Sequence, residues 1–417
     1  MQHFDEKLMG LLKNTLTGGI DILFADALED RLSEEERFAG ALPALKEAAR
    51  RKHWDIFLQI QKGVKLSNGE LGRRLRAQAW EIACEKNLET LVAPLVEEAV
   101  SAGHSAEELG EMAFQTVNFS SQKIEGWIKK GLYRKANAVD ALLSSPALNL
   151  ERHADLLARD ALALMADNAL ARLLPLVSQE WAARTNERGE TALITAAKKA
   201  SEEGTACVKL LLSVSDANVQ EKDGFTALAI AIDNSQAADG TCWTKSVDAL
   251  LPHTDLALKT EDGLTALACA VFTGYAGWRD LLAGSDLGAR TKRGRTVAMM
   301  AAIGDKLEIV EELCQIQPME PEDATEVMAI GENDSDWRLV DWAAQHAPME
   351  NVMATAARAP AGALPKAAAR LAQEEASLLQ AVAGQAALEA NPTQATTAAS
   401  NQQQPANPAQ KTKAARL

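Results

Sequence analysis

The sequence predicts an all-α protein in which short helix–turn–helix units stack on one another. The strings KDGFTALAIAI at residues 222–232 and EDGLTALACAV at residues 261–271 are nearly identical and lie 39 residues apart. Self-similarity at such a period is typical of repeat architectures. The chain of 417 residues is 47% hydrophobic but only 4% aromatic, with Ala and Leu dominant. This composition favours helices over strands.

The acidic charge of the chain limits the partners that we expect. A net charge of −15 repels nucleic-acid phosphates and anionic lipid, so we expect neither nucleic-acid binding nor membrane insertion. The longest apolar stretch, ALACAVF at residues 266–272, is far shorter than a membrane span. The scattered cysteines contain no CxxC pair, and acids stand where a signal peptide needs basic residues. These features predict a cytoplasmic protein with reduced thiols.

Two further strings follow the same plan of a glycine, any residue, a threonine and then small apolar residues. They are ERGETALITAA at residues 187–197 and KRGRTVAMMAA at residues 292–302. The glycine supplies the positive φ of a tight turn. The threonine can cap the helix that follows by accepting a hydrogen bond from a backbone amide. The four turn glycines are Gly189, Gly224, Gly263 and Gly294.

Residues 186–317 resemble the ankyrin repeat family, whose unit of about 33 residues opens with a Gly-x-Thr-Pro-Leu-His motif. AAIGDKLEIVEEL at residues 301–313 is similar to the helix–turn–helix signature of that family. The resemblance implies an ankyrin-type α-solenoid with β-turn-like tips. The chain departs from the family at the Pro and His positions, so the Thr–His hydrogen bond between neighbouring units cannot form. Those positions hold Ala192, Ala227, Ala266 and Val297, and then Ile194, Ala229, Ala268 and Met299.

A fainter copy of the pattern extends toward the N-terminus. AARRKHWDIF at residues 48–57 and IACEKNLETL at residues 82–91 align with the same signature and start 34 residues apart. QKIEGWIKKG at residues 122–131 and NALARLLPLV at residues 168–177 fit the second helices of further units. These units lack the Gly-x-Thr turn, so they are either diverged ankyrin-like helix pairs or a generic α-solenoid.

The chain therefore divides into five expected segments. Residues 363–390 read as one exposed helix, and the last residues contain almost no large apolar side chain, so they cannot offset the entropy of ordering. The segments are an N-terminal helical segment at 1–37, diverged ankyrin-like helical repeats at 38–180, ankyrin repeats at 181–317, atypical capping helices at 318–390 and a disordered low-complexity tail at 391–417.

No motif in the sequence indicates a catalytic, cofactor or metal site, and we expect no small-molecule ligand. The six histidines are far apart, and neither an HExxH motif nor a Gly-rich phosphate loop is present. His53 is expected to face solvent in a turn. His153 could pair with Asp155, but its position at the start of a helix favours a capping role.

A binding surface is instead expected at the stacked tips, where each unit exposes the residues around its glycine. Phe225 and Leu264 follow the glycine in adjacent units and are expected to be exposed, as in an interface hot spot. Phe225 could alternatively fold onto the long turn at residues 233–246, which contains Trp243. The expected partner-binding residues are Lys222, Asp223, Phe225, Glu261, Asp262, Leu264, Lys292, Arg293 and Arg295, with Glu187, Arg188 and Glu190 on the tip before them.

These observations predict a non-catalytic module that presents a concave repeat surface to a protein partner. Two alternatives stay open. The same surface could belong to a secreted bacterial effector that acts on a host protein, with the basic C-terminus as an export signal. An enzymatic or toxin-like activity could reside in residues 1–180, where the repeat pattern is weakest.

Overall fold

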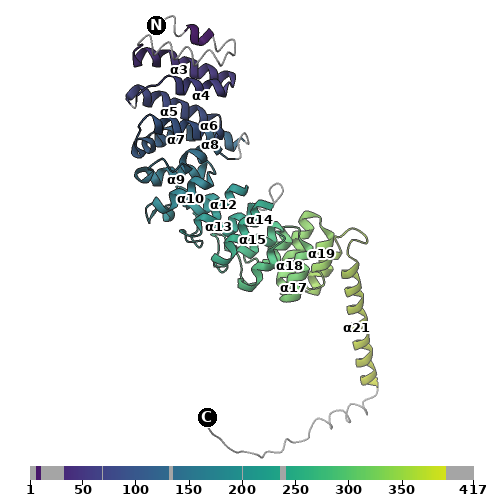
Figure 1. Ribbon diagram of the computed structural model, residues 1–417. Helices are drawn as coiled ribbons and strands as arrows, with labels where there is room; N and C mark the ends of the chain where they lie inside the picture. Colours follow the sequence, from purple (N-terminus) through teal and green to yellow (C-terminus); the bar gives the residue numbers. More distant parts are fainter. Residues whose placement is uncertain are drawn as a thin grey trace, which may run out of the picture. The chain divides into compact units, whose positions relative to one another are not determined.

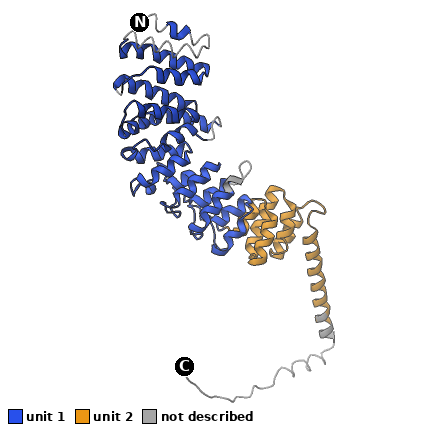
Figure 2. Ribbon diagram, viewed as in Figure 1, with its two compact units in different colours: residues 1–294 blue, residues 295–417 orange. Residues whose placement is uncertain are grey.

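The structure is a computed structural model that describes residues 6–10, 32–67, 69–130, 135–199, 201–234 and 241–390. Figure 2 shows its two compact units, residues 1–294 (unit 1) and residues 295–417 (unit 2). In the described ranges the secondary structure is helical, apart from one isolated β-bridge between Lys259 and Thr265. The predicted all-α class is therefore confirmed. The expected tail at 391–417 and most of the segment at 1–37 lie outside the described residues.

Unit 1 consists of consecutive helix pairs, in each of which a first helix packs against a second helix (Figure 1). The first helices are α3 (Glu34–Arg51), α5 (Glu70–Glu85), α7 (Ala106–Lys129), α9 (Ala154–Ala163), α11 (Ala192–Ala197), α13 (Ala227–Asp233) and α15 (Ala266–Thr273). The second helices are α4 (Trp54–Gly63), α6 (Glu89–Ser101), α8 (Asn137–Ser144), α10 (Asp167–Leu173), α12 (Glu202–Leu211), α14 (Thr241–Leu250) and the 3-10 helix η6 (Trp278–Gly284). Shorter 3-10 turns are η1 (Glu151–His153), η2 (Leu174–Leu176), η3 (Trp181–Ala183) and η5 (Leu251–His253).

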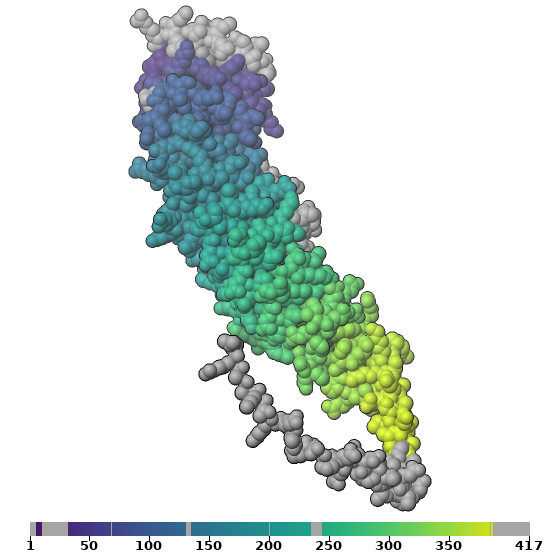
Figure 3. Space-filling view, turned by 60° about the horizontal axis from the view of Figure 1, so that its bottom comes forward, coloured from purple at the N-terminus to yellow at the C-terminus, as the bar shows by residue number. Residues whose placement is uncertain are grey.

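The helix pairs of unit 1 stack in the order of the sequence. From α3 to α15 each first helix packs on the next first helix, and from α4 to α14 each second helix packs on the next second helix. The surface of unit 1 accordingly changes gradually from purple to green in Figure 3, without mixing of distant segments. Each pair is therefore a layer that contacts mainly its two neighbours.

The turn between the first and second helix has the same geometry in several layers of unit 1. One residue adopts the left-handed conformation, as at Lys52 (φ 62°), Asn87 (φ 53°) and Met165 (φ 55°). The next amide donates a hydrogen bond to the carbonyl of a buried alanine five residues earlier, a helix-terminating bond of the Schellman type. These bonds are His53 to Ala48 at 2.9 Å, Leu88 to Ala83 at 2.9 Å and Ala166 to Ala161 at 2.8 Å. The helix–turn–helix predicted at residues 48–57 and 82–91 is confirmed.

The assignment of residues 122–131 to a second helix is wrong. Residues 122–129 form the end of α7, which packs against α5 and α9 and is therefore a first helix. The second helix of this layer is α8, which packs against α6. The other assignment is confirmed, because residues 168–177 contain α10, which packs on α8 and α12.

Side chains of the preceding layers cap α8 and α10, two second helices that lack a cap of their own. The residues before α8 and α10 are alanines, which offer no side-chain acceptor. Asn87 of the preceding layer accepts a hydrogen bond from the Ala138 amide at 3.0 Å, and Asp140 accepts one from the Ala169 amide at 2.7 Å. Free amides at helix starts are thus satisfied across layers. At the other end of α8, Arg172 donates to the carbonyls of Leu143 and Leu148, both at 2.6 Å.

The described part of unit 2, residues 295–390, contains two helix pairs followed by two helices. Asp341 of α19 caps α21 by accepting hydrogen bonds from the amides of Lys366 at 2.9 Å and Ala367 at 3.0 Å. Residues 372–383 of α21 are exposed, whereas Ala367 near its start is fully buried, so the expectation of one exposed helix at 363–390 is confirmed only for the former residues. The helices are α16 (Val297–Ile303), α17 (Leu307–Ile316), α18 (Pro321–Asp334), α19 (Trp337–Ala343), α20 (Met349–Ala356) and α21 (Pro365–Ala390).

Replacing the two left-handed turn residues Lys52 and Asn87 by glycine should have opposite effects. Lys52 is exposed, so Lys52→Gly relieves backbone strain and should stabilise the protein by up to about 1 kcal/mol. Asn87→Gly relieves the same strain but removes the bonds from Asn87 to Lys135 and Ala138. It should therefore cost about 1–2 kcal/mol. Urea unfolding midpoints would compare the variants, and a shift of both in one direction would contradict the cross-layer cap.

Candidate functional site

The tips of unit 1 are tight turns closed by glycines with positive φ. Gly189, Gly224, Gly263 and Gly294 have φ values of 77°, 81°, 82° and 81°. Each glycine amide donates to the carbonyl three residues earlier, at 2.8–2.9 Å. The threonine two residues after each glycine accepts a hydrogen bond from an amide in the first turn of the next helix. Both roles predicted from the Gly-x-Thr pattern are therefore confirmed.

Backbone hydrogen bonds join each tip of unit 1 to the next. The Lys222 amide donates to the Arg188 carbonyl at 3.1 Å, and the Glu261 amide donates to the Asp223 carbonyl at 2.9 Å. The Lys292 amide donates to the Asp262 carbonyl at 2.8 Å in the same way. Because one bond connects each pair of tips, the four turns form a single row with a fixed spacing. We call these four turns, around Gly189, Gly224, Gly263 and Gly294, the tip row.

Glycine is also needed for the close approach of successive tips. A Cβ atom on Gly224 would lie 2.6 Å from the Glu261 amide nitrogen and 2.8 Å from the Thr260 backbone. Real Cβ atoms essentially never approach backbone so closely, so one tip would have to move. A Cβ on Gly294 meets no atom within 4 Å. Gly294 is therefore required for its φ alone, whereas Gly224 is required for both φ and space.

The structure exposes six of the nine predicted partner-binding residues along the tip row. An acidic tip with Glu261 and Asp262 lies directly beside a basic tip with Lys292 and Arg293, because the two are bonded neighbours. The first tip adds two exposed charges of opposite sign, Glu187 and Arg188. The six exposed predicted residues are Lys222, Asp223, Glu261, Asp262, Lys292 and Arg293.

The predicted exposure of Phe225 and Leu264 is wrong, because both side chains are partly buried. The residue after the glycine closes the turn: the Phe225 carbonyl accepts from the Glu221 amide at 3.0 Å, and the Leu264 carbonyl accepts from Thr260 at 2.8 Å. The long turn at residues 235–240 and the Trp243 side chain lie outside the described residues, so the alternative contact of Phe225 stays a prediction.

The same position in the first and last tips carries a charge that is already paired. Glu190 is only 8% exposed and accepts hydrogen bonds from Asn186 at 2.9 Å and from Lys198. Arg295, in unit 2, is partly buried and forms an ion pair with Glu326 at 3.0 Å. These two side chains are therefore held by their own units rather than projecting from the tips.

A family model described as ankyrin repeats (3 copies) matches residues 161–240 and 199–290 of the chain. The chain carries ankyrin repeats. The matched range begins within α9 and includes the first three glycine tips, and the tip at Gly294 follows it with the same turn geometry. No curated protein matches the chain. Ankyrin repeats are in general protein-interaction modules.

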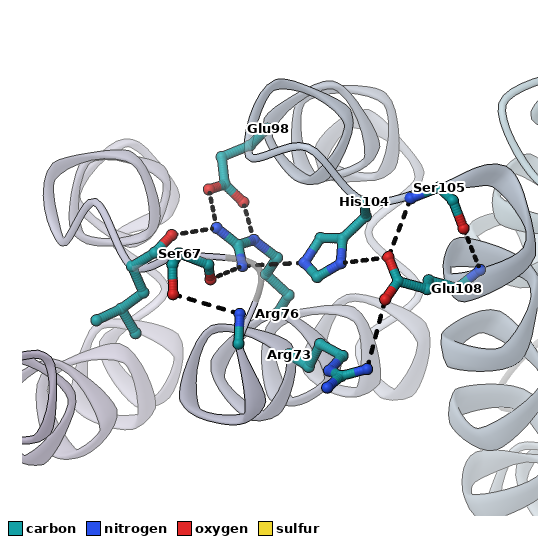
Figure 4. A network of polar contacts seen from close by, with 9 residues as sticks. Ser67, Arg73, Arg76, Glu98, His104, Ser105 and Glu108 are labelled. Carbon is teal, nitrogen blue, oxygen red and sulfur yellow. Dashed lines mark hydrogen bonds and ion pairs between the residues drawn. The ribbon is translucent and has the colours of Figure 1, made fainter.

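Outside the ankyrin match, sequence reasoning missed a buried polar network around Arg76 (Figure 4). Arg76 is 2% exposed and donates to Glu98 through Nε at 3.0 Å and Nη2 at 3.1 Å. It also donates to the carbonyls of Leu66 at 2.9 Å and Ser67 at 3.1 Å. The signal was present in α5, because Arg76 shares the buried face of that helix with residues such as Leu75 and Ala79.

The network fixes the protonation of His104. Its Nε2 lies 3.1 Å from Nη1 of Arg76, and a guanidinium can only donate, so Nε2 is the acceptor and the proton is on Nδ1. Nδ1 points to Glu108, 3.4 Å away. Burial, and secondarily the charge of Arg76, lower the pKa of His104. A cavity of about 580 Å³ lies beside Arg76. The donors of the Arg76 guanidinium already bind groups of the protein, so we interpret the network as structural and not as a ligand site.

The structure corrects the prediction for His153. No side-chain hydrogen bond caps α9 at this residue. The His153 Nε2 instead lies 2.8 Å from Glu111, and its ring stacks on Phe114 with centroids 3.9 Å apart. Asp155, the alternative partner, accepts hydrogen bonds from Ser178. His153 therefore joins the layers of α7 and α9.

Three further findings concern the described residues. They contain no group of three or more His, Cys, Asp and Glu side chains placed to hold a metal ion. None of their helices combines the length and the apolar character that a membrane crossing requires. Burial raises the pKa of the thiols of Cys84, Cys207 and Cys269 to about 12, so these cysteines are unreactive thiols near neutral pH.

Alanine at Gly224 should destabilise the protein more than alanine at Gly294. Both substitutions place a Cβ at positive φ, which costs about 1–2 kcal/mol. Only Gly224→Ala also forces the tip at residues 260–261 to move, at a further cost of about 1–3 kcal/mol. Thermal unfolding followed by circular dichroism would measure the difference, with Gly294→Ala as the matched control. Equal losses would contradict the close approach of the tips.

The contribution of His104 to stability should fall at acidic pH. Because its folded pKa is depressed, the unfolded chain takes up a proton below about pH 6.5 that the folded chain resists. Stability from His104 is therefore present above pH 6.5 and is lost as the pH falls below it. His104→Gln keeps an acceptor for Arg76 but does not titrate. The urea midpoint of wild type relative to this variant should drop between pH 7.5 and pH 5.5, and a constant difference would contradict a neutral His104.

Proposed function

We propose that the chain is a non-catalytic interaction module and that the tip row of unit 1 binds a protein partner. The observation that carries this proposal is the backbone bonding between successive tips. It holds eight exposed charged side chains, from Glu187 to Arg293, in a fixed order along one row. The helix pairs stacked behind the tips support the predicted α-solenoid as the frame of this surface.

A rigid tip row would favour binding because little order has to be created. Each tip is closed by its own glycine turn and bonded to the next, so the charged residues start from fixed backbone positions. The entropy lost on association is then smaller than for a flexible loop. The acidic tip at 261–262 beside the basic tip at 292–293 would orient a partner of reversed charge pattern.

Phe225 and Leu264 keep a place in the proposed surface, but in a different role. Because they are partly buried, they would form an apolar contact surface between the exposed charges and would not project as anchors. Arg295 would contribute less than Lys292 and Arg293, because Glu326 already holds its guanidinium. The partner-binding set is thus centred on the six exposed charges and the two partly buried apolar residues.

The two alternatives gain no specific support. The export signal expected for a secreted effector falls on residues 391–417, outside the described part of the chain. The segment in which an enzymatic activity was considered, residues 1–180, is built in its described part from the same stacked helix pairs as the repeats. An interaction module therefore remains the function that the architecture supports best.

Exchanging the charges of two adjacent tips should disrupt partner capture without changing net charge. The variant Glu261→Lys, Asp262→Lys, Lys292→Glu and Arg293→Glu reverses both tips. Loss of complementary pairs should weaken binding at least tenfold and slow association most. Quantitative pull-down from lysate with mass spectrometry would identify partners that wild type retains and the variant loses.

The matched control exchanges charges away from the tips. Lys209→Glu with Asp280→Lys also leaves net charge unchanged and lies on exposed positions of α12 and η6. It should capture the same partners as wild type. Equal capture by wild type, tip variant and control would place the interface elsewhere and overturn the tip row as the binding surface.

A further inference from the structure

The tip row has an open end beside α9, and a pocket lies there. The first tip, residues 186–190, is bonded to the next tip through Arg188. On its other side the layer of α9 begins with η1 rather than with a glycine tip. A cavity of about 410 Å³ occupies the space between α9, η3, the first tip and α11, all within unit 1. This volume suits one large side chain with its flanking residues.

The interior of the pocket is apolar and is held in place. Trp181 is 6% exposed, and its Nε1 donates to the Asp155 carbonyl at 2.9 Å, which fixes the indole against α9. Leu162 is 5% exposed and lines the same wall. Leu156, one turn before Arg159 on α9, also lines the pocket and is 44% exposed. A large apolar side chain on this lining would bury Leu156 in a contact that the chain itself does not provide.

Two arginines at the pocket remain directed toward solvent. The side chains of Arg159 and Arg184 are 65% and 59% exposed, and both line the cavity. Arg159 contacts Asp160 at 3.1 Å and Arg184 contacts Asp155 at 3.2 Å, and both aspartates are less exposed than their partners. Asp155 is further engaged by two hydrogen bonds from Ser178. A guanidinium has five donors, so each arginine can still bind a carboxylate from outside.

The other carboxylate of the pocket lining, Glu190, is also compensated. Glu190 lines the pocket but is 8% exposed, and Asn186 and Lys198 bind its carboxylate. The pocket therefore combines an apolar interior with two exposed arginines and two carboxylates, Asp155 and Glu190, that groups of the chain already bind. In a chain of net charge −15, this arrangement favours an anionic partner at this place.

We propose that this pocket binds an acidic peptide segment of a protein partner. One large apolar side chain of that segment lies between Leu156 and Trp181, and its neighbouring carboxylates bind Arg159 and Arg184. The proposal rests on the proposed function, because the pocket adjoins the first tip and extends the same binding surface. It adds the chemistry of the partner segment, which is one aliphatic or aromatic side chain flanked by Asp or Glu. Buried apolar anchors and arginine contacts are the usual sources of interface energy.

A selection from a random nonamer peptide library displayed on phage would test this chemistry directly. Wild-type full-length protein is the bait, and synthetic fluorescein-labelled versions of the enriched peptides are then measured by fluorescence anisotropy. We expect enrichment of one Leu, Ile, Phe or Trp flanked by Asp or Glu. Arg159→Glu with Arg184→Glu should weaken these peptides at least tenfold, and analogues with Lys in place of the acids should regain binding to this variant. Enrichment of basic or uncharged peptides, or no enrichment, would overturn the proposal.

A second pair of variants protects the test against misfolding. Arg159→Gln with Arg184→Gln removes the charges without adding repulsion toward Asp155, and Leu156→Ala truncates an exposed side chain; circular dichroism confirms their folding. Each should weaken binding several-fold. The tip exchange at residues 261–262 and 292–293 separates the two hypotheses. Peptides that lose binding to the pocket variants but keep it to the tip exchange support the pocket. Peptides that show the reverse pattern overturn the pocket and leave the tip row as the binding surface.

Discussion

Direct backbone contact between neighbouring layers is the constraint on which unit 1 depends. At the tips, the amide of one turn bonds the carbonyl of the previous turn, and at Gly224 even a single Cβ would collide with the next layer. At the opposite end of the first helix, a fully buried alanine such as Ala48 or Ala83 accepts the bond that ends the helix. Residues with little side chain therefore stand before α11, α13 and α15 and at the ends of α3 and α5. The spacing of the layers, and with it the spacing of the exposed tip charges, follows from them.

Polar side chains add hydrogen bonds between the layers to the backbone contacts that the small residues allow. Asn87, Asp140 and Arg172 reach from one layer to the free amides or carbonyls of a helix in the adjacent layer. Arg76 does the same for the loop at residues 66–67 while it pairs with Glu98. Such buried groups are costly unless every partner is present. They make the stacking of layers specific, because a helix placed in another order would leave its ends unsatisfied.

The sequence predicts local features well and cross-layer features poorly. The turn at Gly224 and the cap at Thr226 depend on the residue itself and its immediate neighbours, so their pattern alone identifies them. The exposure of Phe225 depends on how the turn closes, and the prediction failed there. The assignment of residues 122–131 failed because α7, with 24 residues, is longer than its neighbours. The pocket at Leu156 depends on what the adjacent layer lacks, which no local pattern shows.

The order of stacking in unit 1 has a consequence for how the protein is made. Contacts of α5 reach back to α3 and forward to α7, and the later helices repeat this short reach along the chain. A helix pair that leaves the ribosome thus finds its earlier neighbour already synthesised and can bury its apolar face at once. Folding can proceed vectorially with translation, without waiting for distant segments. An architecture of this kind exposes only one unfinished layer at a time to aggregation.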